Sequence, residues 1–198
     1  MTITAQRPAS VEQTLGAPLR WLVWRCDAPA RDEFGRRLSV SGRVQLRQAA
    51  ARLLGDDPGA PARDEHGRWL WPQLCLHGSV STVPGLVSVA LSTIGPVGVD
   101  IQDERHRPHA ITWARRKLGA ESASRSVNLG DFSEIESLLK GAGLVDRQPE
   151  TVALPMWRPG WRSTPDGWWV RSSRLDDLAA FASIVATAPR PVSIEGQP

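Results

Sequence analysis

The 198-residue sequence contains no Tyr, only two Cys and only two Lys. Cys26 and Cys75 lack the spacing of metal ligands, and no cluster of Cys or His surrounds them. The scarcity excludes a small disulfide-stabilised scaffold and argues against a zinc site, because both need several cysteines at short spacings. We therefore expect two reduced thiols in a cytoplasmic protein.

Long apolar stretches and blocks of like charge are also missing. No uninterrupted apolar run approaches the length of a membrane span. Residues 1–19 lack the basic start and apolar core of a secretion signal. The net charge of +3 is dispersed, without a long basic run. The sequence therefore predicts a protein whose partners include neither a membrane nor a nucleic acid.

The composition is nevertheless sufficient for a folded core, since 41% of the residues are hydrophobic and 23% are charged. The length suits one domain or two small lobes. Periodicity and turn residues predict strands over 22–24, 86–91, 97–102, 168–171 and 179–186, helices over 41–54, 107–125 and 131–142, and a loop over 56–67. Ser41 is the expected N-cap of the first helix, and Gly55 its end.

The predicted strand over 97–102 has the sequence VGVDIQ. Alternate side chains of a strand point to opposite faces, so Val97 and every second residue after it are expected in a core. Asp100 then shares the other face with Gly98 and Gln102.

The predicted helix over 131–142 has clear signals at both ends. Asp131, with Glu134 three residues later, resembles a capping box, and Gly143 stands where a C′ glycine belongs. The expected buried stripe consists of Phe132, Ile135, Leu139 and Ala142.

A strand acid, Asp100, followed by a helix with Glu136 and Lys140 one turn apart, suits magnesium and phosphate. Mg²⁺ takes carboxylate and phosphate oxygens, and a nearby lysine neutralises phosphate charge. Lys140 is notable because 22 of the 24 basic residues are Arg. The alternative interpretation is an exposed carboxylate beside an ordinary surface pair.

Two segments in this order resemble a known family: LHGSVSTVPGLVSVALSTIGPVGVDIQ and, further on, FSEIESLLKGAG. They are similar to the signature of 4′-phosphopantetheinyl transferases of the surfactin-synthetase-activating (Sfp) type, Gly-[Ile/Val]-Asp-x-Glu and then [Trp/Phe]-[Ser/Thr/Cys/Ala]-x-Lys-Glu-[Ser/Ala]-x-x-Lys. The matching residues are Gly98, Val99, Asp100, Phe132, Ser133, Glu136, Ser137 and Lys140. Upstream, LRQAAARLLG and EHGRWLWP resemble the N-terminal helix and the Gly-[Lys/Arg]-Pro loop of that family.

The resemblance implies an α+β fold of the 4′-phosphopantetheinyl transferase type. Such a fold is a pseudo-dimer of two similar α/β halves in one monomeric chain, with a ligand cleft between them. We expect residues 1–18 to be a mobile N-terminus, 19–96 the N-terminal half and 97–198 the C-terminal half of one compact unit.

The resemblance also implies an activity: transfer of phosphopantetheine from coenzyme A to a serine of an acyl or peptidyl carrier protein in polyketide or nonribosomal peptide biosynthesis. Asp100, Glu136 and Gln102 would bind Mg²⁺. Asp100, Glu136 and Lys140 would be catalytic, with Glu136 deprotonating the carrier serine. Arg68, Thr82 and Lys140 would contact coenzyme A.

Four positions depart from the family pattern. Gln102 stands in place of a Glu, Ile135 in place of a Lys, Trp69 in place of a Pro, and Thr82 in place of a coenzyme-binding His. His77 lies five residues before Thr82, and we interpret it as a loop or core histidine. Losing charged contacts to phosphate weakens coenzyme binding, since each contributes about 1.5–3 kcal/mol.

These departures leave alternatives open. One is an enzyme of the same fold that acts on a biosynthetic intermediate, for example in a cyclisation, without coenzyme A. Another is a non-catalytic binder of carrier proteins. The run Arg115–Lys117 is either a solvated helix face or a docking site for an acidic carrier protein. The tryptophans from Trp157 onward either pack in the core or line an apolar pocket.

Overall fold

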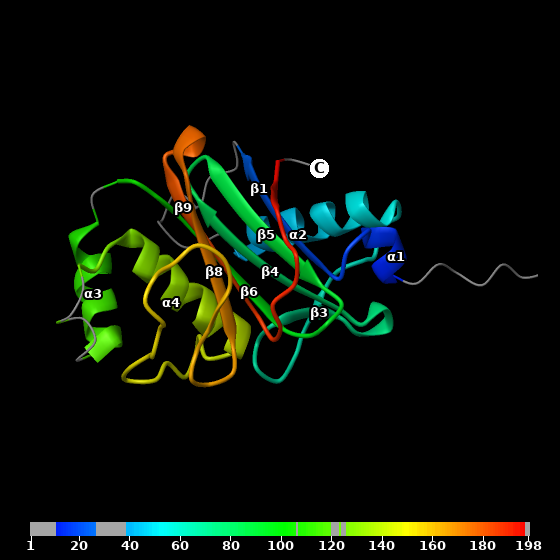
Figure 1. Ribbon diagram of the computed structural model, residues 1–198. Coiled ribbons are helices and arrows are strands. Elements are labelled where there is room, and N and C mark those ends of the chain that lie inside the picture. The colour runs from blue at the N-terminus through cyan, green and yellow to red at the C-terminus, as the bar shows by residue number, and fades with distance from the viewer. Residues whose placement is uncertain (1–10, 27–38, 106, 120–122, 124–125, 197–198) are drawn as a thin grey trace, which may run out of the picture.

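The computed structural model describes residues 11–26, 39–105, 107–119, 123 and 126–196, which form a mixed α+β fold as the sequence predicts (Figure 1). The helices are α1 (Val11–Leu15), α2 (Ser39–Leu54), α3 (Pro108–Leu118) and α4 (Leu129–Ala142), with 3₁₀ turns η1 (Pro72–Leu74) and η3 (Asp176–Leu178). The strands are β1 (Leu19–Arg25), β2 (Ala62–Arg63), β3 (Trp69–Trp71), β4 (Leu76–Val83), β5 (Leu86–Ser92), β6 (Val97–Asp103), β7 (Arg162–Ser163), β8 (Trp169–Leu175), β9 (Ala180–Ala186) and β10 (Ile194–Glu195).

The strands form two sheets. The first contains six strands in the order β10-β1-β5-β4-β3-β2, and the second contains four in the order β6-β9-β8-β7. Neighbouring strands are antiparallel except β1 and β10, which are parallel. The short strand β10, which the sequence does not predict, brings the C-terminal segment to the edge of the first sheet.

The two sheets pack face to face, and helices cover their outer faces. Side chains of β1, β5, β6 and β9 form the core between the sheets. A second core lies between the first sheet and helices α1 and α2, and a third lies between the second sheet and helices α3 and α4. Accordingly, α2 and α4 lie on opposite sides of the strands in Figure 1. Among the helices described, none is both long and apolar enough to cross a membrane.

Strand β6 alternates as predicted. Val97, Val99 and Ile101 are buried in the core between the sheets. Gly98 faces α4 so closely that an added Cβ would lie 2.0 Å from the backbone oxygen of Ser137. No side chain fits into that distance, so glycine is required for α4 to lie directly on β6.

The N-terminal cap of α4 differs from the prediction. The helix begins at Leu129, because the side chain of Asn128 accepts a hydrogen bond from the backbone of Gly130 and the carboxylate of Asp131 accepts one from the backbone of Asn128. Asp131 is therefore the third residue of the helix and not its cap, and Glu134 is left for another role. The C-terminal end follows the prediction, with Gly143 at φ +70°.

The predicted buried stripe of α4 is confirmed for Ile135 and Leu139, which are fully buried, whereas Phe132 and Ala142 are only partly buried.

Other boundaries also shift. Helix α2 begins at Ser39, so Ser41 lies inside the helix and is not its N-cap. Helix α3 ends at Leu118, before Gly119, although a helix is predicted over 107–125. Residues 120–122 and 124–125 of that range lie outside the described residues. In the predicted N-terminal segment, residues 1–10 lie outside the described residues, whereas α1 forms a short helix whose Leu15 is buried.

The two halves of the chain repeat one order of elements: strand, helix, two-residue strand, tight turn, strand, 3₁₀ turn and strand. The series is β1, α2, β2, β3, η1 and β4 in the first half, and β6, α4, β7, β8, η3 and β9 in the second, where the additional helix α3 stands between β6 and α4. Both tight turns have the same backbone bonds, Asp64 to Arg68 and Gly67 in one and Thr164 to Trp168 and Gly167 in the other.

The 3₁₀ turns are alike as well. Each ends in a non-glycine residue with left-handed backbone, Cys75 at φ 47° and Ala179 at φ 46°. Such backbone is costly for residues with a side chain, so its occurrence at matching places is a specific similarity. The halves differ in that β5 lies between β1 and β4, whereas β6 pairs directly with β9.

Candidate functional site

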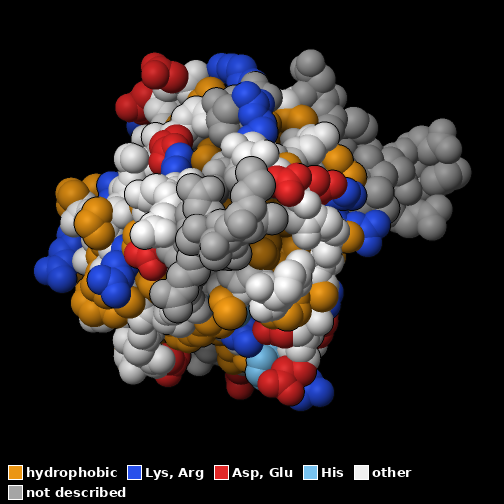
Figure 2. All heavy atoms as spheres, turned by 90° about the vertical axis from the view of Figure 1, so that its right-hand side faces the viewer, with side chains coloured by type: hydrophobic (Ala, Val, Ile, Leu, Met, Phe, Trp, Pro, Cys, Tyr) orange, Lys and Arg blue, Asp and Glu red, His pale blue; other side chains and the backbone are white. Residues whose placement is uncertain are grey.

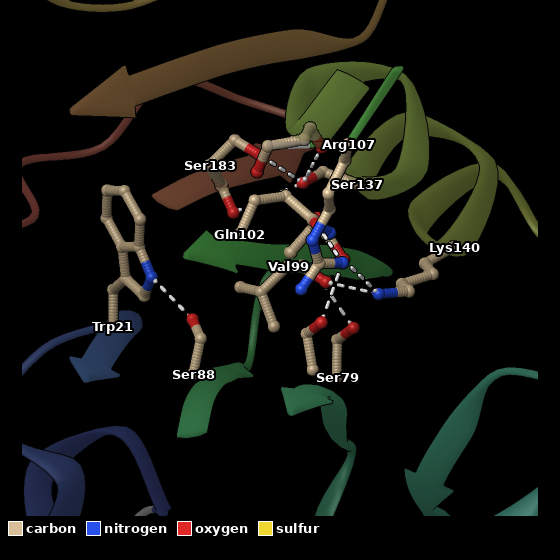
Figure 3. Close-up of polar contacts among 12 residues, drawn as sticks. Trp21, Ser79, Ser88, Val99, Gln102, Arg107, Ser137, Lys140 and Ser183 are labelled. Carbon is tan, nitrogen blue, oxygen red and sulfur yellow. Dashed lines mark hydrogen bonds and ion pairs between the residues drawn. The ribbon is translucent and has the colours of Figure 1, made fainter. Parts of the chain in front are cut away.

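The candidate site is centred on Asp100 of β6, which lies where the two sheets and α4 meet. Its side chain is 3% exposed. Lys140, in the last turn of α4, places its Nζ 2.7 Å from Asp100 Oδ1 and 3.1 Å from the backbone oxygen of Val99 (Figure 3). The structure thus brings together two of the residues that the sequence selects, although they lie forty positions apart.

The first sheet contributes two serines to the same place. The Oγ of Ser81, on β4, donates a hydrogen bond of 2.8 Å to Asp100 Oδ1. The Oγ of Ser79 accepts one of 3.0 Å from the backbone nitrogen of Val99. In Figure 3, Ser79 approaches this stretch of β6 from one side and Lys140 from another. Asp100 is therefore held by both halves of the chain.

Gln102 completes the surroundings of Asp100. Its Nε2 donates a hydrogen bond of 2.6 Å to Asp100 Oδ2, and its Oε1 accepts one of 3.0 Å from Arg107. Arg107 also forms an ion pair with Asp103 at 2.6 Å. The Arg107 guanidinium fixes the orientation of the Gln102 amide, because only the oxygen of that amide can accept a hydrogen bond from it.

The predicted ligands of Mg²⁺ are Asp100, Glu136 and Gln102. As placed, both oxygens of Asp100 accept hydrogen bonds from protein donors, and Gln102 turns its nitrogen toward Asp100. Mg²⁺ needs oxygen ligands in near-octahedral geometry. The described part of the chain contains no group of three or more His, Cys, Asp or Glu side chains placed to hold a metal. The side chains in this arrangement do not fit the ion.

Glu136 lies on α4 one turn before Lys140 and is partly buried. The i,i+4 spacing predicts this placement, in which Glu136 and Lys140 lie on the same side of the helix. Its assignment as the base stays a prediction.

Arg68 lies in the turn between β2 and β3 and reaches the last turn of α4. Its Nε forms an ion pair with Asp64 at 2.7 Å, and its Nη1 lies 3.5 Å from the backbone oxygen of Gly141. Partial burial raises the pKa of Asp64, but hydrogen bonds from the backbone and side chain of Arg68 outweigh that effect and lower it. Arg68 and Lys140, which the resemblance assigns to coenzyme A, thus lie at the same end of α4.

Thr82 does not join this group. On β4, His77, Ser79 and Ser81 share the face turned toward β6, as the contacts of the two serines show. Thr82 is on the opposite face, paired with Val87, which belongs to the core under α2. The strand alternation therefore separates Thr82 from Asp100.

His77, which we interpreted from sequence as a loop or core histidine, lies instead on the face of β4 that carries the site. Its Nδ1 is buried and has no hydrogen-bond partner among the described residues. Burial lowers the pKa of His77, the Arg68 guanidinium lowers it further, and Asp64 opposes both. Alternation from Ser81 along β4 is the sequence signal that could have identified it.

A second ion pair of α4 escaped the sequence analysis. Glu134 and Arg162 are both almost fully buried, with side chains 2% and 1% exposed and Oε1 2.5 Å from Nη2. Ser172 donates to the same Glu134 oxygen and accepts from Trp157, and Arg162 also donates to the backbone of Pro155. The sequence assigns Glu134 to a capping box, and no local pattern points to its pairing with Arg162.

The remaining candidates are dispersed. Arg115 and Arg116 are exposed on α3, whereas Lys117 lies over the ring of Trp113 at 5.6 Å. Trp161 and Trp168 pack against two different cores. On the face shown in Figure 2, acidic and basic side chains are interspersed and no large patch of one sign is visible.

No family model matches the chain and no curated protein matches it significantly, so its functional assignment depends on the residues and the geometry described above.

Proposed function

We propose that the chain is a divergent 4′-phosphopantetheinyl transferase, which moves phosphopantetheine from coenzyme A to a serine of an acyl or peptidyl carrier protein. One observation carries the proposal: Asp100 of the first motif and Lys140 of the second meet at 2.7 Å, with Glu136 one helical turn away. Motif residues far apart in sequence converge at one place, as they would in a shared site.

The fold supports the proposal in a second way. The two halves repeat one order of elements, including matching turns and matching left-handed residues. Such a repeat is what a pseudo-dimer of two similar halves would produce. Asp100 lies where β4 of one half meets β6 of the other, the place expected for a ligand between halves.

The chemistry assigned to these residues is positioning and charge neutralisation. The serine oxygen of the carrier attacks the β-phosphorus of coenzyme A, and Glu136 accepts the serine proton. The new O–P bond replaces the bond from that phosphorus to the bridging oxygen, and adenosine 3′,5′-bisphosphate leaves. Lys140 and Arg68, both cationic and at one end of α4, stabilise the negative charge on the phosphates.

A second candidate function has its own supporting observation. Both oxygens of Asp100 are engaged by protein donors, and Thr82 is on the far face of β4. Of the contacts expected for coenzyme A and its metal ion, those of Thr82 and Asp100 are therefore not offered in this arrangement. The same site could then act on a biosynthetic intermediate without coenzyme A, with Glu136 as acid or base.

The test is to incubate the protein with several apo carrier proteins and coenzyme A, with and without Mg²⁺, and to measure intact mass. We expect the carrier to gain one phosphopantetheine, and Glu136→Gln to abolish the gain. Glu150→Gln, which removes an exposed acid outside the site, is the matched control. A folded protein that modifies no carrier and binds no coenzyme A would contradict the transferase proposal and favour the second candidate.

A further inference from the structure

The exposure of the Asp100–Lys140 pair is asymmetric. The Asp100 side chain is 3% exposed, whereas that of Lys140 is 19% exposed. A ligand approaching from solvent therefore reaches the Lys140 side chain before it reaches the Asp100 carboxylate. An ammonium has three N–H donors, and Asp100 and the Val99 backbone account for two contacts. Asp100 and Val99 thus hold the ammonium of Lys140 in place and leave one of its N–H donors for a ligand.

The carboxylate is closed to a metal ion by its neighbours. Ser81 and Lys140 donate to Oδ1 of Asp100, and Gln102 donates to Oδ2 at 2.6 Å. A divalent cation would have to displace these donors and approach the positive charge of Lys140. Repulsion between like charges a few ångströms apart in a partly buried site opposes that approach.

Gln102 determines which cation the site can use. A carboxylate at this position would repel the carboxylate of Asp100, and a metal ion between the two acids would relieve that repulsion. The amide donates a hydrogen bond to Asp100 instead, and Arg107 holds it in that orientation at 3.0 Å. The need for a second positive charge beside Asp100 is thereby removed.

We propose that Lys140 takes the place of a divalent metal ion at this site: its ammonium, held by Asp100 and Val99, binds a phosphate oxygen of an anionic ligand directly. The choice of the diphosphate of coenzyme A as that ligand rests on the proposed function. The absence of a metal requirement rests on the contacts of Asp100 alone.

The first test is to titrate Mn²⁺ into the protein and follow the free ion by electron paramagnetic resonance, with and without coenzyme A. We expect the wild type and Asp100→Asn to give the same curve, because Asp100 is not available to the ion. Mn²⁺ binding by the wild type that Asp100→Asn removes would overturn the proposal.

A gain-of-function variant sharpens this test. Gln102→Glu replaces the donor with a carboxylate, and we expect Mn²⁺ to bind at least about tenfold more tightly than to the wild type, which is about 1.4 kcal/mol. Gln73→Glu, at an exposed position in η1, is the matched control and should change nothing. A folded Gln102→Glu protein with unchanged Mn²⁺ affinity would show that Gln102 does not close the site.

The second test measures coenzyme A affinity by isothermal titration calorimetry in EDTA and in Mg²⁺. We expect the same affinity in both, and a loss of about ten- to hundredfold for Lys140→Met, the usual effect of one charged hydrogen bond. Lys117→Met removes the other lysine of the chain and serves as the control. Binding that needs Mg²⁺, or a folded Lys140→Met protein that binds as the wild type does, would overturn the proposal.

The two proposals fail in different ways. If coenzyme A binds under neither condition, the transferase function fails, whereas the Mn²⁺ titration still decides which cation Asp100 accepts. If coenzyme A binds only with Mg²⁺, the transferase function stands and the assignment of Lys140 as the replacing cation fails.

Discussion

Helix α4 carries two ion pairs of opposite construction. Near its start it supplies an acid, Glu134, to Arg162 of β7, and both side chains are at most 2% exposed. Near its end it supplies a base, Lys140, to Asp100 of β6, and the base is 19% exposed. The difference in exposure separates a pair that only the fold can use from a pair that a ligand can reach.

The buried pair connects the segment before β7 to α4. Arg162 donates to Glu134 and to the backbone of Pro155, and Ser172 links Glu134 to Trp157. Because both side chains are almost fully buried, no ligand reaches them from solvent in this conformation, and the pair serves the fold. Such a pair adds little net stability as a whole, yet removing one member leaves an uncompensated buried charge. In the other pair the acid is also buried, but without Lys140 it would keep the hydrogen bonds from Ser81 and Gln102, which lessen this cost.

The largest expected effect is at the buried pair. Arg162→Leu leaves Glu134 charged and without its cation, so we expect a loss of about 3–5 kcal/mol in the free energy of unfolding. Chemical denaturation measures it. The double variant Glu134→Leu/Arg162→Leu removes the unpaired charge and should recover most of the loss. A single variant that loses less than about 1 kcal/mol would show that water or another donor replaces Arg162.

A smaller effect is expected at the partly exposed pair, Lys140–Asp100. In Lys140→Met, Asp100 keeps the hydrogen bonds from Ser81 and Gln102, so the loss in unfolding free energy should be about 1.5–3 kcal/mol. The same denaturation measurement applies, with Arg52→Met, at an exposed position of α2, as the control. A loss as large as that of Arg162→Leu would break the distinction between the two pairs and would make Lys140 primarily a structural residue.

The sequence predicts most of what local patterns determine. Alternation in β6 places Val97 in the core and Asp100 on the other face, and Gly143 marks the end of α4. Both features depend on neighbours a few residues away. The pairing of Asp100 with Lys140 follows from the family resemblance and not from local pattern.

The errors have a common physical origin in tertiary contacts. Asp131 and Glu134 have the spacing of a capping box, but Asn128 makes the cap and Glu134 turns inward to Arg162, which lies 28 positions away. The family resemblance places Thr82 in the site, whereas the register of β4 places His77 and Ser81 there. No periodicity within one element reports which distant element covers it.

The smallest expected effect is at a third ion pair, Arg47–Asp57, which extends the comparison to the surface. Both side chains are nearly half exposed, at 46% and 49%, and the Arg47 Nε lies 2.8 Å from Asp57 Oδ1. The hydrogen bond from Arg47, followed by one from the backbone of Gly59, lowers the pKa of Asp57 to about 2. Solvent screens such a pair, so Arg47→Met should leave the thermal midpoint at neutral pH nearly unchanged.

The pKa itself should respond to that change. Because the folded-state pKa of Asp57 lies below its ordinary value of 3.8, the small stabilisation that screening leaves to the pair is present above that value and is lost as pH falls through about 2. In Arg47→Met the Gly59 contact remains, so the pKa, followed by nuclear magnetic resonance, should rise toward 3.8 without reaching it. A thermal midpoint that falls as far as in Lys140→Met would mean that exposure does not rank the three pairs, and the distinction drawn on α4 would lose its physical basis.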